Sequence, residues 1–319
     1  MNAEPRRIAY SQLPETPGGA RSGWGLFGDR GSLGLFNELG AEQTLAAAQL
    51  VRRGAVFPLD VRSDYITPPI FSRGALRRTT FEVRKDEALD DVFDNFYPQA
   101  GSQWDAIGHV AFRPGEFYDG ATTDDMLHGR RNTIDFVAQR GIATRGVLVD
   151  VGAAIVERGG AGGSVPVTAS DIDSALAAAG LTLRRGDVLL LHTGFLHWYG
   201  QQDAAERRRM SRRELLTAPG IEHTAEMAEY LWDSQIVAIA TDTAGAEVWP
   251  PDERAEAWPF GFMHQILLGQ FGMGLGELWW LHDLAMDCRD DGVFEVLLTS
   301  APMNVPGAIG SPANALAVK

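Results

Sequence analysis

The stretch RGDVLLLHTGF (185–195) decides the fold class, because its unbroken apolar run is typical of a strand buried on both faces. Three further stretches are also expected to form strands: RGVLVDVGAA (145–154), IVAIATDT (236–243) and FEVLLTSAP (294–302). Helices are expected between them, at TASDIDSALAAAG (168–180), which starts with capping residues and ends at a glycine, and at the amphipathic APGIEHTAEMAEYLWDS (218–234). Strands and helices that intermix in this way favour a layered α/β protein.

The first third of the chain adds shorter elements to this pattern. GAEQTLAAAQLVRRG (40–54) has helical spacing, and AVFPLDV (55–61) and TTFEVR (79–84) are expected to be strands. No order is predicted for KDEALDDVFDN (85–95). Residues 1–22 are polar and rich in Pro and Gly, so they are expected to form an irregular N-terminal arm. No repeat or linker divides residues 23–319, which predicts a single domain there.

The composition narrows the classes of function. The chain has 319 residues, of which 45% are hydrophobic and 22% charged, as in a soluble globular protein with a large core. Its net charge of −14 argues against nucleic acid or an anionic membrane surface as a partner. The one cysteine, Cys288, excludes a disulfide framework and a thiolate metal cage, and is expected to be a packed thiol. No export segment or membrane-spanning run is visible, so a cytoplasmic enzyme is expected.

The stretch GSQWDAIGHV (101–110) places an amide, a carboxylate and an imidazole close together, without a Ser or Cys nucleophile. In an extended segment Gln103 and Asp105 point to one face and Trp104 to the other. A turn after Asp105 would let His109 swing back toward the same space. Oxygen and imidazole donors suit a divalent metal, which can supply the nucleophile by lowering the pKa of bound water to about 7. The alternative is a simple turn with a hydrogen-bonded core histidine.

A second stretch, FMHQILLGQFGMGLGELWWLHDLA (262–285), places His264 thirteen residues before Glu277. On one continuous helix these two side chains would lie on nearly opposite faces, since each residue advances by about 100°. They can converge only if the chain breaks between them, and a break is expected at Gly272, Gly274 and Gly276. The alternative is a helix, a glycine turn and a solvent-facing acid.

With these residues in view, the sequence resembles the cyclase family, the superfamily of bacterial kynurenine formamidase and isatin hydrolase. The resemblance runs from SGWGLFGD (22–29) through RGVLVDV (145–151) and GDVLLLHTGF (186–195) to LLTSAPMNVPGAIGSPANALAV (297–318). These blocks look like the longer-chain branch, which includes a zinc-dependent dienelactone hydrolase. The family signature H-x-G-T-H-x-D-x-P-x-H falls on QAGSQWDAIGH (99–109). The resemblance implies a swivelling β/β/α fold, with mixed sheets packed with helices.

Position by position, the resemblance implies that Asp105 is the metal-binding aspartate and His109 the histidine that shuttles a proton. His264 and Glu277 match the downstream ligands. The two signature histidines are Gln99 and Gln103 here, and an amide oxygen is a weaker and harder ligand than imidazole. The signature Thr and Pro are also replaced, by Ser102 and Ile107. We therefore expect one divalent metal, zinc or manganese, bound by Asp105, His264 and Glu277, with Gln103 as a candidate fourth ligand and Gln99 as a weaker candidate.

The resemblance also implies the activity of a metal-dependent hydrolase that opens an acyl C–N or C–O bond of a small cyclic amide, formamide or lactone. Candidate substrate-binding residues are His192 and the aromatic residues Trp24, Phe27, Trp104, Phe112 and Trp279, for each of which a core role is the alternative. His128, His197, His223 and His282 are expected at the surface, and Asp242 outside the first layer of the site. A homodimer or homotetramer is implied, with the pocket near a subunit interface. Two other functions remain open: a ring-closing cyclase or dehydratase, and a metal-poor binding protein on the same fold.

Overall fold

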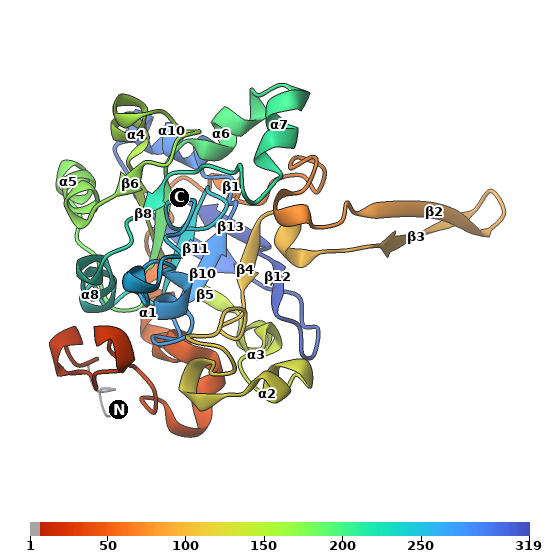
Figure 1. The fold of residues 1–319 in the computed structure, drawn as a ribbon. Helices are drawn as coiled ribbons and strands as arrows, with labels where there is room; N and C mark the ends of the chain where they lie inside the picture. The colour runs from red at the N-terminus through yellow and green to blue at the C-terminus, as the bar shows by residue number, and fades with distance from the viewer. Residues whose placement is uncertain (1–6) are drawn as a thin grey trace.

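A mixed β-sheet runs through the computed structural model, which describes residues 7–319 (Figure 1). Within those residues the sheet has nine strands, and the four in the middle, from β5 to β10, are parallel to one another. In spatial order the strands are β1 (Val56–Pro58), β13 (Ala315–Val318), β11 (Glu295–Ser300), β5 (Ile142–Asp150), β7 (Val188–His192), β9 (Ala238–Thr241), β10 (Gly274–Glu277), β4 (Gln103–Asp105) and β12 (Gly310–Pro312). Strands β7 and β9 are buried along their whole length, which explains their unbroken apolar sequences.

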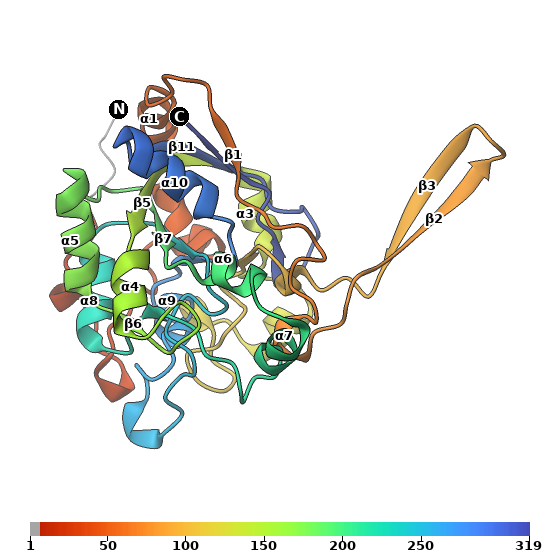
Figure 2. The ribbon, with the colours of Figure 1, turned by 90° about the horizontal axis from the view of Figure 1, so that it is seen from above.

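Helices surround this sheet, as Figures 1 and 2 show. Their bounds are α1 (Ala41–Ala48), α2 (Thr123–Leu127), α3 (Ile134–Arg140), α4 (Gly152–Arg158), α5 (Ala169–Ala179), α6 (Phe195–Gly200), α7 (Ala204–Met210), α8 (Ala225–Asp233), α9 (His264–Leu267) and α10 (His282–Asp291). Helix α5 starts at the Thr168 cap and ends at left-handed Gly180, as its sequence predicts. Short 3-10 turns include η1 (Tyr10–Gln12), η2 (Pro17–Gly19), η3 (Gly28–Glu38), η4 (Ile70–Ser72), η5 (Pro98–Ala100), η6 (Tyr118–Gly120) and η7 (Ala255–Ala257).

The predicted α/β class is confirmed, and the differences concern boundaries. The helix predicted over 218–234 begins only at Ala225, because residues 220–221 form the strand β8 (Gly220–Ile221) beside β6 (Pro166–Val167). Cys288 is buried within α10, as expected of a packed thiol. Residues 85–95, for which no order is predicted, contain the strand β3 (Ala88–Asp94). Its apolar residues Leu89, Val92 and Phe93 do not alternate regularly with polar ones, and every residue of the strand is exposed.

Strand β3 pairs with β2 (Arg77–Arg84) in a two-stranded antiparallel hairpin, which we call the projecting hairpin (residues 77–94). Figures 1 and 2 show it extending away from the rest of the molecule. Every residue of both strands is exposed to solvent.

The strand register assigns side chains to the two faces of the sheet. Paired residues share a face and successive residues alternate. Asp105 pairs with Leu275, which pairs with Ile239, and Ile239 in turn pairs with Leu189. Glu277 lies two positions after Leu275 in β10 and therefore shares this face with Asp105. His192 is an odd number of positions from Leu189 and therefore points to the opposite face.

The beginning of the described chain packs against the body. Arg7 forms a buried ion pair with Glu38 at 2.9 Å and donates to the Ile236 carbonyl at 2.8 Å. The backbone of Tyr10 donates to Asp233 at 2.8 Å. Residues 1–6 of the predicted N-terminal arm lie outside the described residues. Between residues 7 and 319, no helix combines the length and apolar composition needed to cross a membrane.

Arg145 on β5 anchors the sheet through a buried ionic cluster. Its guanidinium donates to Asp187 at 2.6 and 2.9 Å and to Glu295 at 2.8 Å. Asp150, at the end of the same strand, pairs with His192 and Arg289.

We predict that Arg145→Ala lowers the free energy of unfolding by about 3–5 kcal/mol, because it leaves the buried Asp187 carboxylate without its partner. Urea denaturation measures this loss. The matched control is Arg62→Ala, which removes a solvent-exposed pair with Asp64 and should change stability by less than about 1 kcal/mol. Equal effects of the two substitutions would contradict the assignment.

Candidate metal centre

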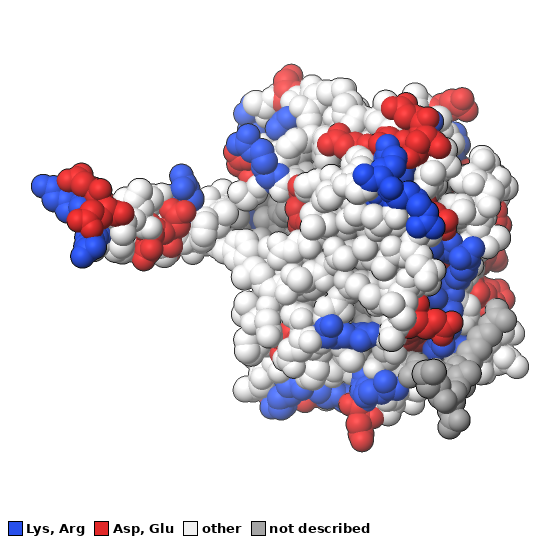
Figure 3. Space-filling view, turned by 180° about the vertical axis from the view of Figure 1, so that it is seen from behind, with Lys and Arg blue, Asp and Glu red and all other residues white. Residues whose placement is uncertain are grey.

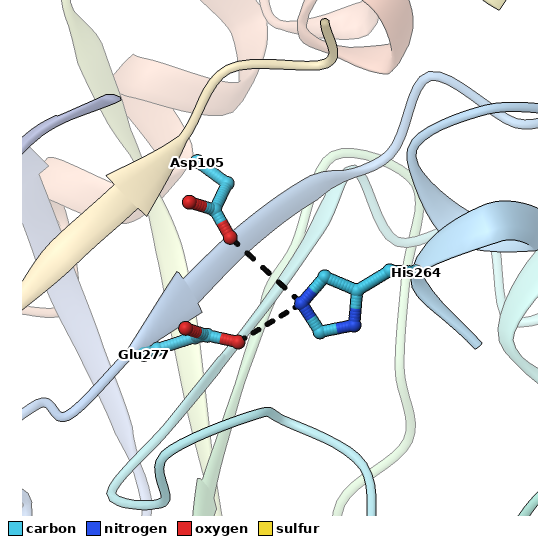
Figure 4. A group of neighbouring side chains, drawn as sticks. All are labelled: Asp105, His264 and Glu277. Carbon is cyan, nitrogen blue, oxygen red and sulfur yellow. Dashed lines mark hydrogen bonds and ion pairs between the residues drawn. The ribbon is translucent and has the colours of Figure 1, made fainter. Parts of the chain in front are cut away.

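Three side chains from separate segments converge in the interior, as Figure 4 shows. Asp105 ends β4, Glu277 ends β10 and His264 begins α9. His264 Nε2 lies 3.1 Å from Glu277 Oε1 and 3.9 Å from Asp105 Oδ2. One potential ligand atom from each residue falls within 4.8 Å of the others, and all three residues are buried. The convergence predicted from the sequence is thus present in the structure.

Backbone pairing brings the two carboxylates together. Strand β10 runs antiparallel to β4, with Leu275 opposite Asp105 and Glu277 opposite Gln103. Both acids therefore project from neighbouring strands on one face. His264 reaches this face because the chain reverses between α9 and β10 at Gly272, which has a φ of +60°.

Two of the three glycines predicted to break the chain have another role. Gly274 and Gly276 lie inside β10, where a Cβ would meet the Phe36 ring at 2.4 Å and the Trp279 indole at 2.9 Å, respectively. Glycine is needed at both positions because aromatic side chains pack directly on this strand. The break itself depends on Gly272.

The unsatisfied polar atoms of the site test whether it fits a cation. Both carboxylate oxygens of Asp105 and the amide oxygen of Gln103 are buried without a hydrogen-bond partner. A buried polar group without a partner costs free energy, and a buried charge costs far more. Two carboxylates, an imidazole and an amide oxygen form a donor set that a borderline or hard divalent ion would satisfy. The residues present therefore fit a divalent metal.

The pKa values of Asp105 and His264 also indicate that the two buried carboxylates favour a positive charge beside them. Burial, and then the neighbouring Glu277 carboxylate, raise the pKa of Asp105 well above its ordinary value. Burial alone would lower the pKa of His264, but Glu247 and Glu277 outweigh this effect and raise it to about 10. Without a cation, the cluster thus retains protons that ordinary carboxylate and imidazole groups would lose at neutral pH.

Glu247, which no sequence argument identified, fixes the His264 ring through Nδ1, the nitrogen that faces away from the acid cluster. Its fully buried carboxylate accepts a hydrogen bond from His264 Nδ1 and others from the backbone of Met263 and His264. This contact leaves His264 Nε2 directed toward Asp105 and Glu277. His223 Nε2 lies 3.0 Å from the other Glu247 oxygen, so His223 is largely buried here and not the surface residue predicted.

Charge balance around Glu247 supports this role. Burial would raise its pKa, but His223 and His264 overcome that effect and hold the pKa of Glu247 below its ordinary value. No motif spacing marks Glu247 in the sequence. The only signal is an acid shortly after a buried strand, in ATDTAGAEVWP (240–250), a stretch in which Asp242 is expected to lie outside the first layer of the site. Asp242 accepts hydrogen bonds from Thr193 and Gly194 and so holds the end of β7.

His109 stands beside the cluster as predicted. A turn closed by the His109 amide on the Ala106 carbonyl, at 2.8 Å, brings its Nε2 to 3.8 Å from Asp105 Oδ1. Its side chain is 27% exposed, whereas those of the three cluster residues are at most 6% exposed. Burial, followed by the charges of His264 and Arg73, lowers the pKa of His109 to about 3. The imidazole is therefore neutral near pH 7.

The two glutamines that replace the signature histidines occupy different positions. Gln103 Nε2 donates to Glu277 Oε2 at 2.6 Å, so the amide orients this carboxylate. The side chain of Gln99 lies against Gly310, where a Cβ would be 2.5 Å from its Nε2. Its carbonyl accepts a hydrogen bond from Arg73, a cation missed in the sequence whose charge interacts with Glu277 and Asp105.

The predicted substrate-binding residues are placed less favourably. Trp104 and Trp279 form an edge-to-face pair in the core, on the face opposite Asp105, and His192 points to that opposite face too. Phe112 is fully buried against Trp258. The core alternative accounts for the burial of these four residues, and their role in substrate binding stays a prediction.

Two of the aromatic residues predicted to bind substrate are partly exposed, and the structure adds Phe262 as a further candidate. Trp24 donates its indole N–H to the Gly269 carbonyl at 2.8 Å, and Phe27 packs at the edge of the core. Phe262 stacks on the His264 ring, with ring centroids 4.6 Å apart. It is half-buried and directly contacts a cluster residue, so it is a better candidate for a wall of the site than the aromatic residues chosen from sequence.

A family model and several solved structures are similar to this chain. The family model described as "Putative cyclase" matches residues 43–248. The chain is similar to a crystal structure of a novel cyclase, with 28% identity and a TM-score of 0.81 over 93% of this chain and 99% of that one. It also resembles isatin hydrolase A from Labrenzia aggregata, with 17% identity and a TM-score of 0.60 over 86% of this chain and 97% of that one. A third similar structure is isatin hydrolase A from Ralstonia solanacearum, with 18% identity and a TM-score of 0.61 over 88% of this chain and 98% of that one. No curated protein matches the chain.

The identities to the isatin hydrolases are low, so that likeness shows a shared fold. Asp105 and His109 lie inside the family match, whereas His264 and Glu277 follow it along the chain. The likeness to the novel cyclase covers nearly the whole chain and confirms the predicted cyclase-like β/β/α fold. Because the family model spans well over half of the 319 residues, the chain belongs to the cyclase family.

Proposed function

We propose that this protein is a metal-dependent hydrolase that opens an acyl C–N or C–O bond of a small cyclic amide, formamide or lactone. One observation carries the proposal: the buried Asp105 carboxylate has no hydrogen-bond partner, beside His264, Glu277 and a neutral His109. The fold shared with isatin hydrolases supports a ring-bearing amide as the proposed substrate, since isatin is a cyclic amide. A metal-poor binding protein has no comparable reason to bury an unpartnered carboxylate.

Asp105, His264 and Glu277 would hold the ion, with the Gln103 amide oxygen as a candidate fourth ligand. When bound, a divalent zinc or manganese ion supplies Lewis acidity and lowers the pKa of water to near neutrality. The two carboxylates would balance the two charges of the ion. Gln103 and Glu247 keep Glu277 and His264 in place. His109 accepts a proton at Nε2 from the attacking water and returns it to the leaving group. Phe262 excludes water from one side of the site.

The first test compares two substitutions with opposite consequences. Asp105→Asn should empty the site, because it removes one of the two carboxylates that balance the ion. His109→Ala should keep about one ion per chain while lowering kcat at least about 100-fold, as expected for loss of a general base. Metal analysis by mass spectrometry, together with hydrolysis assays, measures both effects. Stoichiometric metal in Asp105→Asn would contradict the ligand set, and loss of metal in His109→Ala would make His109 a ligand.

The second test concerns Glu247. Glu247→Gln should weaken metal affinity by about 10- to 100-fold, because the neutral amide no longer fixes the His264 ring and its basicity. Competition with a chelating dye measures this affinity without reference to turnover. Glu253→Gln is the matched control, since Glu253 is exposed and pairs with Arg213 at the surface. Unchanged affinity in Glu247→Gln would show that Glu247 only fills space.

The substrate class is tested with a panel of N-formyl aromatic amides, cyclic amides and lactones, followed by product analysis. We expect ring opening or deformylation by the metal-loaded protein, loss of turnover on chelation, and recovery with zinc or manganese. Turnover that survives complete metal removal would contradict the proposal. Net ring closure under the same conditions would favour the cyclase alternative.

A further inference from the structure

A cavity of about 790 Å³ lies outside the carboxyl ends of β5 and β7. Strand β5 ends at Asp150 and β7 at His192, and both residues line the cavity. The other walls come from α4, α6, α10 and the loop over residues 159–163, and Figures 1 and 2 show these three helices close together. Because His192 points to the sheet face opposite Asp105, the cavity is separate from the candidate metal centre. Ligands of α/β proteins often bind outside the carboxyl ends of parallel strands.

Three of the seven histidines of the chain gather at this cavity. They come from separate elements, since His192 ends β7, His197 lies in α6 and His282 begins α10. The rings of His197 and His282 are stacked, with their centroids 3.8 Å apart and their planes at 12°. The ring centroid of His192 lies 6.1 Å from that of His282. His197 and His282, which are expected at the surface, are thus half-buried against each other.

The stacked arrangement does not suit a metal ion. Two imidazoles bind one ion when their in-plane lone pairs converge on a point about 2 Å from each nitrogen, whereas the lone pairs of stacked rings run side by side. Between residues 7 and 319, the group of acids and histidines whose ligand atoms converge is that of Asp105, His264 and Glu277. The cavity therefore requires another kind of ligand.

The carboxylate of the cavity is already satisfied, whereas several hydrogen-bond donors are not. Asp150 accepts hydrogen bonds from His192 Nδ1 at 2.9 Å and from Arg289 Nε at 2.6 Å. Arg289 Nη1 contacts the Met286 sulfur at 3.5 Å, a weak acceptor. Within the described part of the chain, the ring nitrogens of His282 have no hydrogen-bond partner. One edge of a guanidinium and one imidazole thus remain available to a ligand that accepts hydrogen bonds.

Positive charge surrounds His282. Burial lowers its pKa, and the charges of three residues at the cavity lower it further, namely His197, His192 and Arg289. Asp283 acts in the opposite direction and does not outweigh them. The protein as a whole has a net charge of −14, and Figure 3 shows acidic side chains interspersed with basic ones on the face that it draws. An anion would therefore be held by donors of this cavity and not by the general field of the protein.

Apolar groups form the other side of the cavity. The indole of Trp198 packs directly on Gly162, where a Cβ would overlap the ring. Ala153 and Val156 of α4 line the cavity beside it, and Val156 is 66% exposed. A ligand with an apolar body would cover these groups while its polar end meets the imidazole and the guanidinium.

We propose that this cavity is a second ligand site, which binds a small organic acid with its carboxylate at His282 and Arg289 and its apolar body against Trp198. A carboxylate matches the planar edge of a guanidinium and carries one negative charge. A phosphate dianion would bring two charges to a cavity whose guanidinium already pairs with Asp150. The proposal is independent of the proposed hydrolase activity.

Isothermal titration calorimetry of the full chain with benzoate tests the proposal, with neutral benzamide and inorganic phosphate as comparison ligands. Benzoate should bind more tightly than either. His282→Asn combined with Arg289→Gln should raise the benzoate Kd at least about 10-fold, because charge-assisted hydrogen bonds are lost. Ala153→Phe should also raise it, because the ring fills the cavity without removing a donor. The matched control is His128→Asn, an exposed histidine beside Asp124, which should bind benzoate as the wild type does.

A further variant separates the cavity from the metal centre, since a carboxylate can also bind a metal ion. Asp105→Asn should leave the benzoate Kd unchanged. Loss of benzoate binding in Asp105→Asn would overturn the proposal, because it would place the ligand at the metal centre. Wild-type affinity in both cavity variants, or equal affinity for benzoate and benzamide, would overturn it too.

A pH series tests the role of His282. A carboxylate bound beside the imidazole raises the pKa of His282, so that binding takes up a proton. The benzoate affinity should therefore increase as the pH falls from about 8 to about 5.5, across the range in which histidine titrates. His282→Asn alone should remove most of this dependence, whereas Arg289→Gln should keep it. A Kd of the wild type that does not change with pH would contradict the contact with His282.

Discussion

The buried carboxylate of Asp105 is the constraint on which the candidate site depends. It sits at the end of a sheet strand, with neither oxygen hydrogen-bonded and a second carboxylate, Glu277, on the neighbouring strand. Two acids buried side by side are stable only if they are protonated or share a cation. The imidazole of His264, within 4 Å of both, completes a donor set of the kind that metals select. The proposed chemistry depends on a cation that neutralises the buried carboxylates of Asp105 and Glu277.

The sheet positions that charge and separates it from the core. The pairing of β4 with β10 fixes Asp105 and Glu277 on one face, while the same two strands turn Trp104 and Gly276 to the other. There the indoles of Trp104 and Trp279 pack edge to face. Behind His264, Glu247 and His223 extend the polar network away from the site. Rigid strands on one side and a held histidine on the other leave little freedom for the three donors.

Sequence reasoning predicted the parts that local pattern or motif can specify. Continuous apolar runs predicted the buried parallel strands, and caps predicted helix α5. The family motif singled out Asp105 and His109, and alternation along an extended segment placed Trp104 on the other face, as the register confirms. The convergence of His264 and Glu277 required only a break in the chain, which Gly272 supplies.

What the sequence could not predict depends on tertiary packing. Glu247 is seventeen residues from the histidine it contacts, and no spacing rule links a loop acid to a helix start. The aromatic residues were chosen as wall candidates by type, yet burial and face are decided by the sheet register, which a single sequence does not show. Strand β3 escaped notice because a hairpin without a core needs no alternation of apolar and polar residues.

The central claim is tested most directly by anomalous X-ray diffraction from crystals of the protein loaded with zinc or manganese. The account predicts one anomalous peak at about 2.0–2.2 Å from an oxygen of Asp105, Nε2 of His264 and an oxygen of Glu277. A metal-loaded crystal with no peak among these three side chains, or with the ion bound elsewhere, would contradict it.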